Sequence, residues 1–81
     1  MDNSNLVLYY FPSCPYCQKV LRFLKRNNIE INLRNIHKDK AADKKLVEVG
    51  GKRQVPCLFI DGKPMYESDD IIEWFKNNYN N

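Results

Sequence analysis

Hydrophobic and polar positions change their period twice in the first half of the chain. Leu6 to Phe11 (LVLYYF) is a continuous apolar and aromatic run, which is typical of a strand buried on both faces. From Pro15 onward the apolar residues recur at the spacing of one helical face, and the Asn27-Asn28 pair stops this pattern. Ile29 to Asn35 then alternates between apolar and polar residues, which predicts a second strand. Strand, helix and strand in this order indicate a right-handed βαβ unit with parallel strands.

A second helix is predicted after this unit. Asp39 is a good N-cap, and Gly50-Gly51 is a stop signal. Between them, three apolar residues at helical spacing form the expected inner stripe: Ala42, Leu46 and Val49.

The rest of the chain predicts a hairpin followed by a helix. A short apolar strand, CLFI (Cys57–Ile60), is joined by an Asp61-Gly62 turn to a return strand through Lys63 to Tyr66. Ser68 is a good N-cap for the last helix, whose first turn carries two aspartates. Its apolar side consists of Ile71, Ile72, Phe75 and Tyr79. The order βαβαββα, without repeats or linkers, predicts one α/β domain over residues 1–81.

Composition and charge narrow the function classes. The 81 residues are 43% hydrophobic and 28% charged, which is ordinary for a soluble globular domain. A net charge of +3 is too small by itself to indicate a nucleic-acid-binding protein. No apolar run approaches the roughly 18 residues that a membrane span requires. The N-terminus has neither a basic segment nor a small-residue cleavage site, so we predict no secretory signal and a cytoplasmic protein.

The stretch FPSCPYC (Phe11–Cys17) holds two of the three cysteines. A structural zinc site needs two ligand pairs, and the remaining candidates, Cys57 and the single His37, lie at unrelated spacings. A structural disulfide is disfavoured in a cytoplasmic chain. We therefore expect no metal at this motif. We interpret Cys57 as a small buried hydrophobe and His37 as a solvated residue.

A redox role has a physical reason at each position of CPYC. Cys14 lies at the predicted junction of a strand and a helix, where the first unpaired N–H groups of the helix favour a thiolate. Lys19 and Arg53 are expected nearby and would add to this effect. Cys17 lies one turn inward on the apolar stripe, where its thiol should stay protonated. We therefore predict that Cys14 attacks a disulfide and that Cys17 resolves the intermediate.

Three features in order resemble a glutaredoxin: CPYC after a buried strand, Val55-Pro56 before the third strand, and ESDD at the start of the last helix. The similarity runs from Leu6 to about Tyr79. The resemblance implies a thioredoxin-like fold, with a four-stranded mixed sheet and helices on both faces.

The resemblance also implies a site for the tripeptide glutathione. The Val55–Pro56 peptide bond should be cis and lie beside Cys14, so that the backbone there can pair with that of the tripeptide. Arg53 should donate to the glycyl carboxylate, and Ser68 and Asp69 should hold the γ-glutamyl end at a helix N-terminus. The full expected set is Tyr16, Arg53, Gln54, Val55, Pro56, Glu67, Ser68 and Asp69.

Two positions depart from the family pattern. Phe11 stands where many glutaredoxins carry lysine, and Tyr66-Glu67 stands where many carry a glycine pair. The stretch MYESDDI is closer to the N-terminal domain of glutathione transferases, in which Glu-Ser holds the same γ-glutamyl group. We do not expect a full transferase, because 81 residues leave no room for its C-terminal helical domain.

We therefore predict a monomeric, glutathione-dependent thiol–disulfide oxidoreductase without a bound cofactor. Its partners would be glutathione and proteins that carry a disulfide or a glutathione mixed disulfide. One alternative is a redoxin reduced by a flavoprotein reductase. Another is a dimer that holds an iron–sulfur cluster through Cys14 and two glutathiones. The stiff Pro15 disfavours the cluster, because cluster-binding relatives usually carry a smaller residue there.

Overall fold

The structure, a computed structural model, describes residues 5–79. Its elements are β1 (Leu6–Tyr10), α1 (Pro15–Arg26), β2 (Asn32–Asn35), α2 (Lys40–Gly50), β3 (Cys57–Ile60), β4 (Lys63–Tyr66) and α3 (Ser68–Asn78). The strands form one sheet in the order β2-β1-β3-β4, with β1 parallel to β2 and antiparallel to β3. The predicted βαβαββα order and thioredoxin-like fold are confirmed. Within the described residues, no helix is long and apolar enough to cross a membrane.

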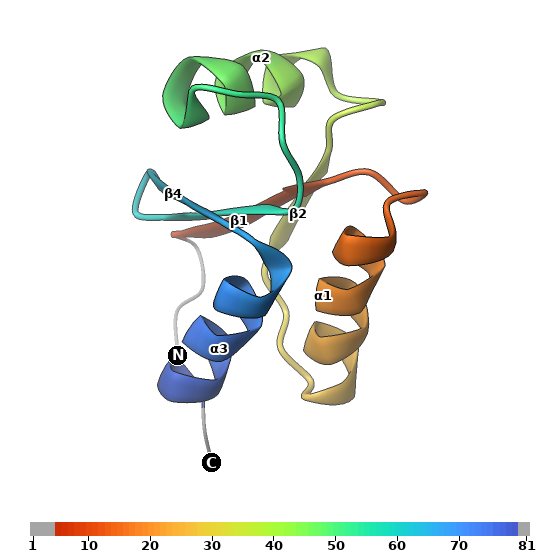
Figure 1. Cartoon of the computed structure of the whole chain (residues 1–81), viewed down its shortest axis with the longest axis vertical. Helices are drawn as coiled ribbons and strands as arrows, with labels where there is room; N and C mark the ends of the chain where they lie inside the picture. The colour runs from red at the N-terminus through yellow and green to blue at the C-terminus, as the bar shows by residue number, and fades with distance from the viewer. Residues whose placement is uncertain (1–4, 80–81) are drawn as a thin grey trace.

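The helices cover both faces of the sheet. α2 lies on one face, and α1 and α3 lie beside each other on the opposite face (Figure 1). Because side chains alternate along a strand, each central strand supplies both layers. Leu6 and Leu8 of β1 belong to the core on the α1–α3 side, whereas Tyr9 belongs to the core beneath α2.

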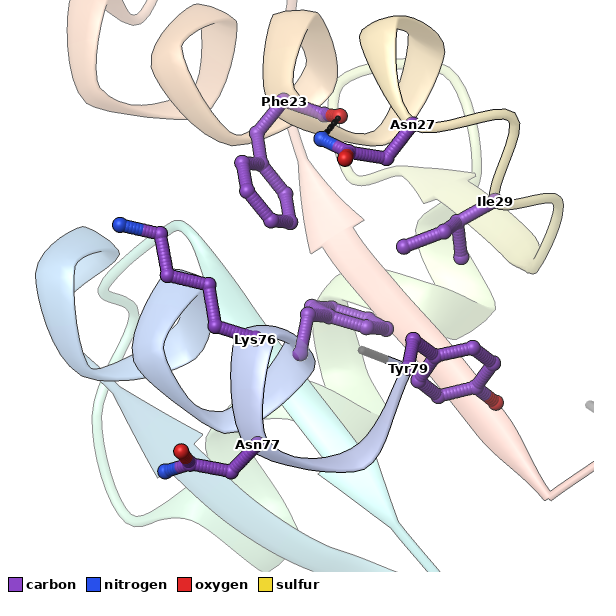
Figure 2. Close-up of a pocket in the computed structure, with 7 residues that line it drawn as sticks. Phe23, Asn27, Ile29, Lys76, Asn77 and Tyr79 are labelled. Atoms are coloured by element: carbon purple, nitrogen blue, oxygen red, sulfur yellow. Dashed lines mark hydrogen bonds between the residues drawn. The ribbon is translucent and has the colours of Figure 1, made fainter. Parts of the chain in front are cut away.

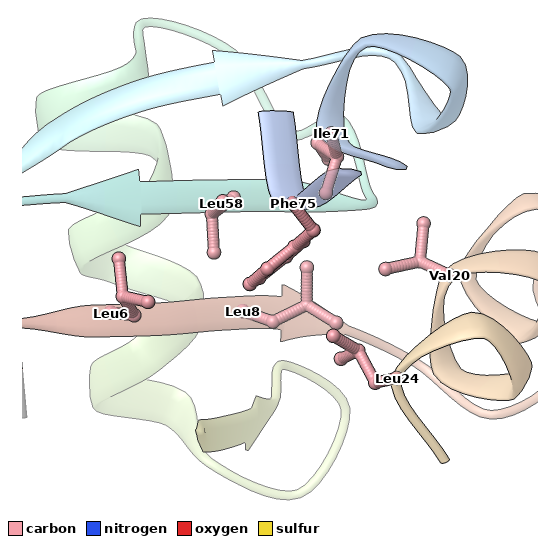
Figure 3. Close-up of a cluster of buried hydrophobic side chains, with 7 residues drawn as sticks. All are labelled: Leu6, Leu8, Val20, Leu24, Leu58, Ile71 and Phe75. Atoms are coloured by element: carbon pink, nitrogen blue, oxygen red, sulfur yellow. The ribbon is translucent and has the colours of Figure 1, made fainter. Parts of the chain in front are cut away.

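The core on the α1–α3 side fixes both of these helices against the sheet (Figure 3). Its buried members come from β1, β3, α1 and α3: Leu6, Leu8, Val20, Leu24, Leu58, Ile71 and Phe75. The core beneath α2 is built from Tyr9, Ile36, Ala42, Leu46, Cys57 and Phe59. No buried side-chain nitrogen or oxygen among residues 5–79 lacks a hydrogen-bond partner.

The predicted stop after α1 is confirmed, and it shortens β2. Asn28 adopts a left-handed conformation (φ 55°). The Ile29 N–H donates to the Leu24 carbonyl (2.9 Å), as at a Schellman helix end. The chain therefore reverses before it can extend, and β2 begins at Asn32 instead of the predicted Ile29. Ile29 and Ile31 pack against the core from this connection.

The second helix has the predicted cap but a shorter inner stripe. The Asp39 Oδ1 accepts a hydrogen bond from the Ala42 N–H (3.0 Å). Val49, however, is 46% exposed, so its place in the stripe was predicted wrongly. The reason lies in the last turn of α2, where the neighbouring Gly50 faces the Tyr66 side chain and makes the contact with the sheet.

Truncation of Phe75 should test the core on the α1–α3 side. Phe75 is fully buried between the sheet and the helices, so we expect Phe75→Ala to lower the free energy of unfolding by about 3–5 kcal/mol. Urea denaturation followed by circular dichroism measures this. Lys76→Ala, at the next and exposed position, should change it by less than about 0.5 kcal/mol. Equal losses in the two variants would contradict this packing.

Candidate active site

Cys14 is the N-cap of α1, in the turn that follows β1. Its backbone is extended (φ −83°, ψ 118°), and its N–H donates to the Phe11 carbonyl (3.2 Å). The Cys17 N–H donates to the Cys14 Sγ (3.3 Å), so a sulfur atom takes the place of the usual capping oxygen. This is the predicted junction of strand and helix. The sulfur lies where the helix dipole stabilises a negative charge.

Cys17 lies one turn further along α1 and is fully buried, whereas Cys14 is 7% exposed. The pKa of the Cys17 thiol is raised to about 12, chiefly because a thiolate would lose its hydration on burial and partly because of the neighbouring Cys14, while a backbone hydrogen bond at Phe11 acts in the opposite direction. Cys17 therefore remains a thiol at neutral pH, as predicted. Both cysteines are free thiols in this structure.

The turn before β3 faces Cys14. The peptide bond between Val55 and Pro56 is cis, as the resemblance implied. The Cys14 Sγ lies 4.0 Å from the Val55 carbonyl oxygen. Pro56 is buried and Val55 is half-buried, so this turn forms a fixed wall beside the sulfur.

Cys57 follows the same turn but points into the core beneath α2. It is fully buried, and this burial raises the pKa of its thiol to about 11. The pKa of Tyr66, its partner on β4, is also raised, to about 12, by burial and by the thiol beside it. The interpretation of Cys57 as a small buried hydrophobe is confirmed.

A groove of about 380 Å³ lies beside this turn. Three separate segments form it: the start of α1, the turn before β3 and the start of α3. Its lining residues are Tyr16, Gln54, Val55, Pro56, Glu67 and Ser68. All six belong to the set predicted for glutathione. The other two members of that set, Arg53 and Asp69, are not in the lining.

Glu67, and not Ser68, is the N-cap of α3, so the predicted cap is one residue too late. The φ angle of Glu67 is 73°, in a region that residues other than glycine rarely adopt, and its side chain makes no capping hydrogen bond. Ser68 is instead the first residue of the helix and is 7% exposed. The Gln54 Nε2 donates to the Glu67 Oε1 (3.4 Å), and both residues line the groove. The two aspartates do lie in the first turn of α3, as predicted.

Another hollow, of about 440 Å³, lies at the far ends of α1 and α3 (Figure 2). Phe23 and Asn27 line it from the α1 side, and Lys76 and Tyr79 line it from the α3 side. None of its lining residues is a cysteine or a residue predicted to bind glutathione. This hollow therefore contains none of the residues predicted for the active site. Among residues 5–79, no group of three or more His, Cys, Asp or Glu side chains could hold a metal ion.

Comparison with known proteins agrees with this geometry. Residues 8–81 match the family described as "Glutathione S-transferase, N-terminal domain". A probable glutaredoxin of Synechocystis sp. is 31% identical over 70 residues, which cover 85% of this chain and 80% of that protein. Glutaredoxin 1 of Rickettsia prowazekii is 33% identical over 70 residues, which cover 83% of this chain and 73% of that protein. The chain belongs to the glutaredoxin family. It is therefore a thiol–disulfide oxidoreductase.

Solved structures show the same fold. A mutant of the thioredoxin-like protein BC3987 superposes with a TM-score of 0.78 at 30% sequence identity, over 94% of this chain and 95% of that one. The match to transferase N-terminal domains agrees with the likeness noted in MYESDDI, which contains the cap of α3.

The charged side chains of this glutaredoxin are paired differently from what the sequence predicts. Lys19 forms an ion pair with Asp69, and Arg53 forms one with Asp43. Each cation that was expected to support the Cys14 thiolate therefore has a carboxylate partner instead. The sequence offers no local signal for these pairs, because one joins α1 to α3 and the other joins α2 to the turn before β3.

A second unpredicted contact is made by Phe11, which stands where many glutaredoxins carry lysine. The Phe11 ring stacks on the His37 imidazole, with ring centroids 4.3 Å apart and planes at 10°. His37 is exposed, as predicted, but it is not free of contacts. Phe11 also packs against the core beneath α2. An aromatic pair therefore lies at this position of the Cys14 turn in place of a lysine.

The differences in burial predict selective alkylation by iodoacetamide. At pH 8, a thiol with a pKa of about 12 is thiolate in about one part in ten thousand, and one with a pKa of about 11 in about one part in a thousand. Cys17 and Cys57 should therefore stay unmodified while Cys14 reacts. Peptide mass spectrometry of the folded protein measures this, and full labelling in urea is the control. Above pH 10, labelling of Cys57 should rise before that of Cys17. Modification of Cys17 first at pH 8 would contradict this order.

Proposed function

We propose that the chain reduces protein–glutathione mixed disulfides and protein disulfides with glutathione as the reductant. Cys14 is the nucleophile and Cys17 is the resolving thiol. One observation carries the proposal: the Cys14 Sγ caps α1 and lies 4.0 Å from the Val55 carbonyl, at the edge of a groove that residues from three segments line. This arrangement supports attack on a disulfide held in the groove.

With a glutathionylated protein, the Cys14 thiolate attacks the glutathione sulfur. The substrate disulfide breaks, a Cys14–glutathione disulfide forms, and the protein leaves as a thiolate that takes a proton from water. The thiolate of a second glutathione then attacks the sulfur of the bound glutathione. This step releases glutathione disulfide and restores the Cys14 thiolate. Cys17 takes no part in this cycle.

With a protein disulfide, Cys14 forms a mixed disulfide with one substrate sulfur. Cys17 must then attack the Cys14 sulfur, which requires removal of its proton. Burial keeps Cys17 protonated, so its proton is transferred as it attacks, to the substrate thiolate that departs when the bond between Cys14 and the substrate breaks. The products are the reduced substrate and a Cys14–Cys17 disulfide, which two glutathiones reduce.

Backbone groups would hold most of the tripeptide. Half-buried Val55 offers its backbone to the cysteine residue of glutathione, as in strand addition. The first turn of α3, beginning at Ser68, offers N–H groups and the positive end of a helix dipole to the γ-glutamyl carboxylate. Tyr16, Gln54 and Glu67 complete the walls. Arg53 and Asp69 are engaged by their present ion-pair partners, which would compete with the ligand for them.

The internal pairing of Arg53 and Asp69 favours a second candidate function, that of a redoxin that receives electrons from a flavoprotein reductase. The two charged side chains assigned to the ends of glutathione are paired within the protein, and Phe11 provides no cation. The same dithiol chemistry would then operate with weaker binding of glutathione. Proteins that carry a disulfide would remain the substrates.

Steady-state reduction of a glutathionylated peptide by glutathione tests the proposal. Wild type and Cys17→Ser should turn over, because only Cys14 reacts in this cycle. Cys14→Ser should lose activity to the uncatalysed background. Thermal melts of the three proteins check that they are folded, and Cys57→Ser serves as a control for loss of an uninvolved thiol.

The outcomes separate the two candidates. Activity in Cys14→Ser would overturn the assignment of the nucleophile. A second outcome is that wild type fails to reduce the glutathionylated peptide with glutathione and yet reduces a protein disulfide when a flavoprotein reductase supplies electrons. That result would exclude glutathione as the reductant. In that case Cys17→Ser should be inactive with the protein disulfide as well.

A further inference from the structure

Asp43, in the first turn of α2, holds the guanidinium of Arg53 by two hydrogen bonds. The Arg53 Nε donates to the Asp43 Oδ1 (2.7 Å), and the Nη2 donates to the Oδ2 (3.0 Å). The carboxylate thereby raises the pKa of Arg53, first through the hydrogen bond and then through its charge. The Asp43 side chain is only 28% exposed, whereas that of Arg53 is 64% exposed. The carboxylate is therefore the fixed member of the pair.

This pair is formed next to the groove but not in it. Arg53 immediately precedes Gln54 and Val55, which line the groove, yet Arg53 itself is absent from the lining. A carboxylate that positioned Arg53 for a ligand would direct the guanidinium into the groove. Here the guanidinium is directed to α2 and is paired there with the Asp43 carboxylate.

We propose that Asp43 is a specificity-determining residue, which competes with the glycyl carboxylate of glutathione for Arg53. This inference rests on the proposed function, because it concerns the ligand assigned to that groove. Asp43 occupies the Nε and Nη2 donors of the guanidinium, so two-bond binding of the tripeptide at this edge exchanges one carboxylate for another. The ion pair with Asp43 must weaken as the ligand pair forms, so Asp43 reduces the advantage that a C-terminal carboxylate would otherwise have.

The size of the effect follows from the exposure of the pair. Exposed ion pairs contribute little in water, so removal of the competing charge should tighten binding by about two- to fivefold. Added salt screens exposed charges, so the gain should shrink when the ionic strength rises from about 0.01 M to 1 M.

Asp43→Asn is the decisive variant, because it keeps the shape and one oxygen acceptor and removes only the charge. NMR titration with S-methylglutathione gives the Kd without any need for turnover. We expect the Kd to fall about two- to fivefold at low salt. With the glycyl amide of S-methylglutathione, which lacks the carboxylate, the Kd should be the same as in wild type. Arg53→Gln added to Asp43→Asn should abolish the gain.

Glu48→Gln is the matched control. It lies on the same helix, changes the net charge by the same amount, and breaks a different pair, with Lys44 at 3.8 Å. Its Kd should equal that of wild type. A Kd that rises in Asp43→Asn would show that Asp43 positions Arg53, and a gain that persists with the amide or appears in Glu48→Gln would show a general charge effect. Each of these results would overturn the inference, as would the absence of measurable binding in both wild type and Asp43→Asn.

The failure of this inference differs from the failure of the proposed function. Carboxylate-selective binding without turnover of the glutathionylated peptide would reject the function and keep the role of Asp43 in ligand choice. Turnover of the glutathionylated peptide, together with equal binding of the acid and the glycyl amide, would keep the function and reject the role of Asp43.

Discussion

The pairing of β1 with β3 brings the turn that carries Cys14 against the turn that precedes β3. Tyr9 lies opposite Cys57, so the chain leaving β1 and the chain entering β3 meet at the same end of the two central strands. The turn that carries Cys14 is thereby brought against Val55, 41 residues away. A shift of this register by one residue would turn Leu6 and Leu8 out of the core on the α1–α3 side. The packing of that core therefore enforces the geometry of the site.

Helix α1 produces the difference in environment between Cys14 and Cys17. The apolar stripe of α1, with Val20 and Leu24 at its centre, anchors the helix on the sheet. Cys17 lies on that stripe and is buried with it, while Cys14 precedes the first turn and keeps a small exposed area. A single amphipathic helix thus places one sulfur where negative charge is stabilised and the other where it is disfavoured. The roles proposed for the two thiols are consistent with this asymmetry.

Local patterns were enough to predict the elements and most of the groove, whereas side-chain pairing between elements was not predictable. The strand–helix junction at Cys14 could be read from a change of period, and the groove residues from their place in family motifs. The cap at Glu67 was missed, because serine is the better cap by propensity and the φ of 73° depends on tertiary context. The Asp43–Arg53 pair was missed because it depends on how α2 lies over the turn before β3.

The fold determines the shape of the groove and its backbone donors, whereas exposed side chains determine the charges beside it. Its shape and its backbone donors come from the cis turn at Val55 and from the first turn of α3, which the sheet and core hold in place. The charged residues Arg53 and Asp69, which follow the same segments but do not line the groove, are paired with residues of α2 and α1. Substitution of such partners changes no core contact and costs little stability. With the roles proposed for Arg53 and Asp43, substitutions outside the groove would alter the preference for a zwitterionic peptide and leave the proposed chemistry of the two thiols unchanged.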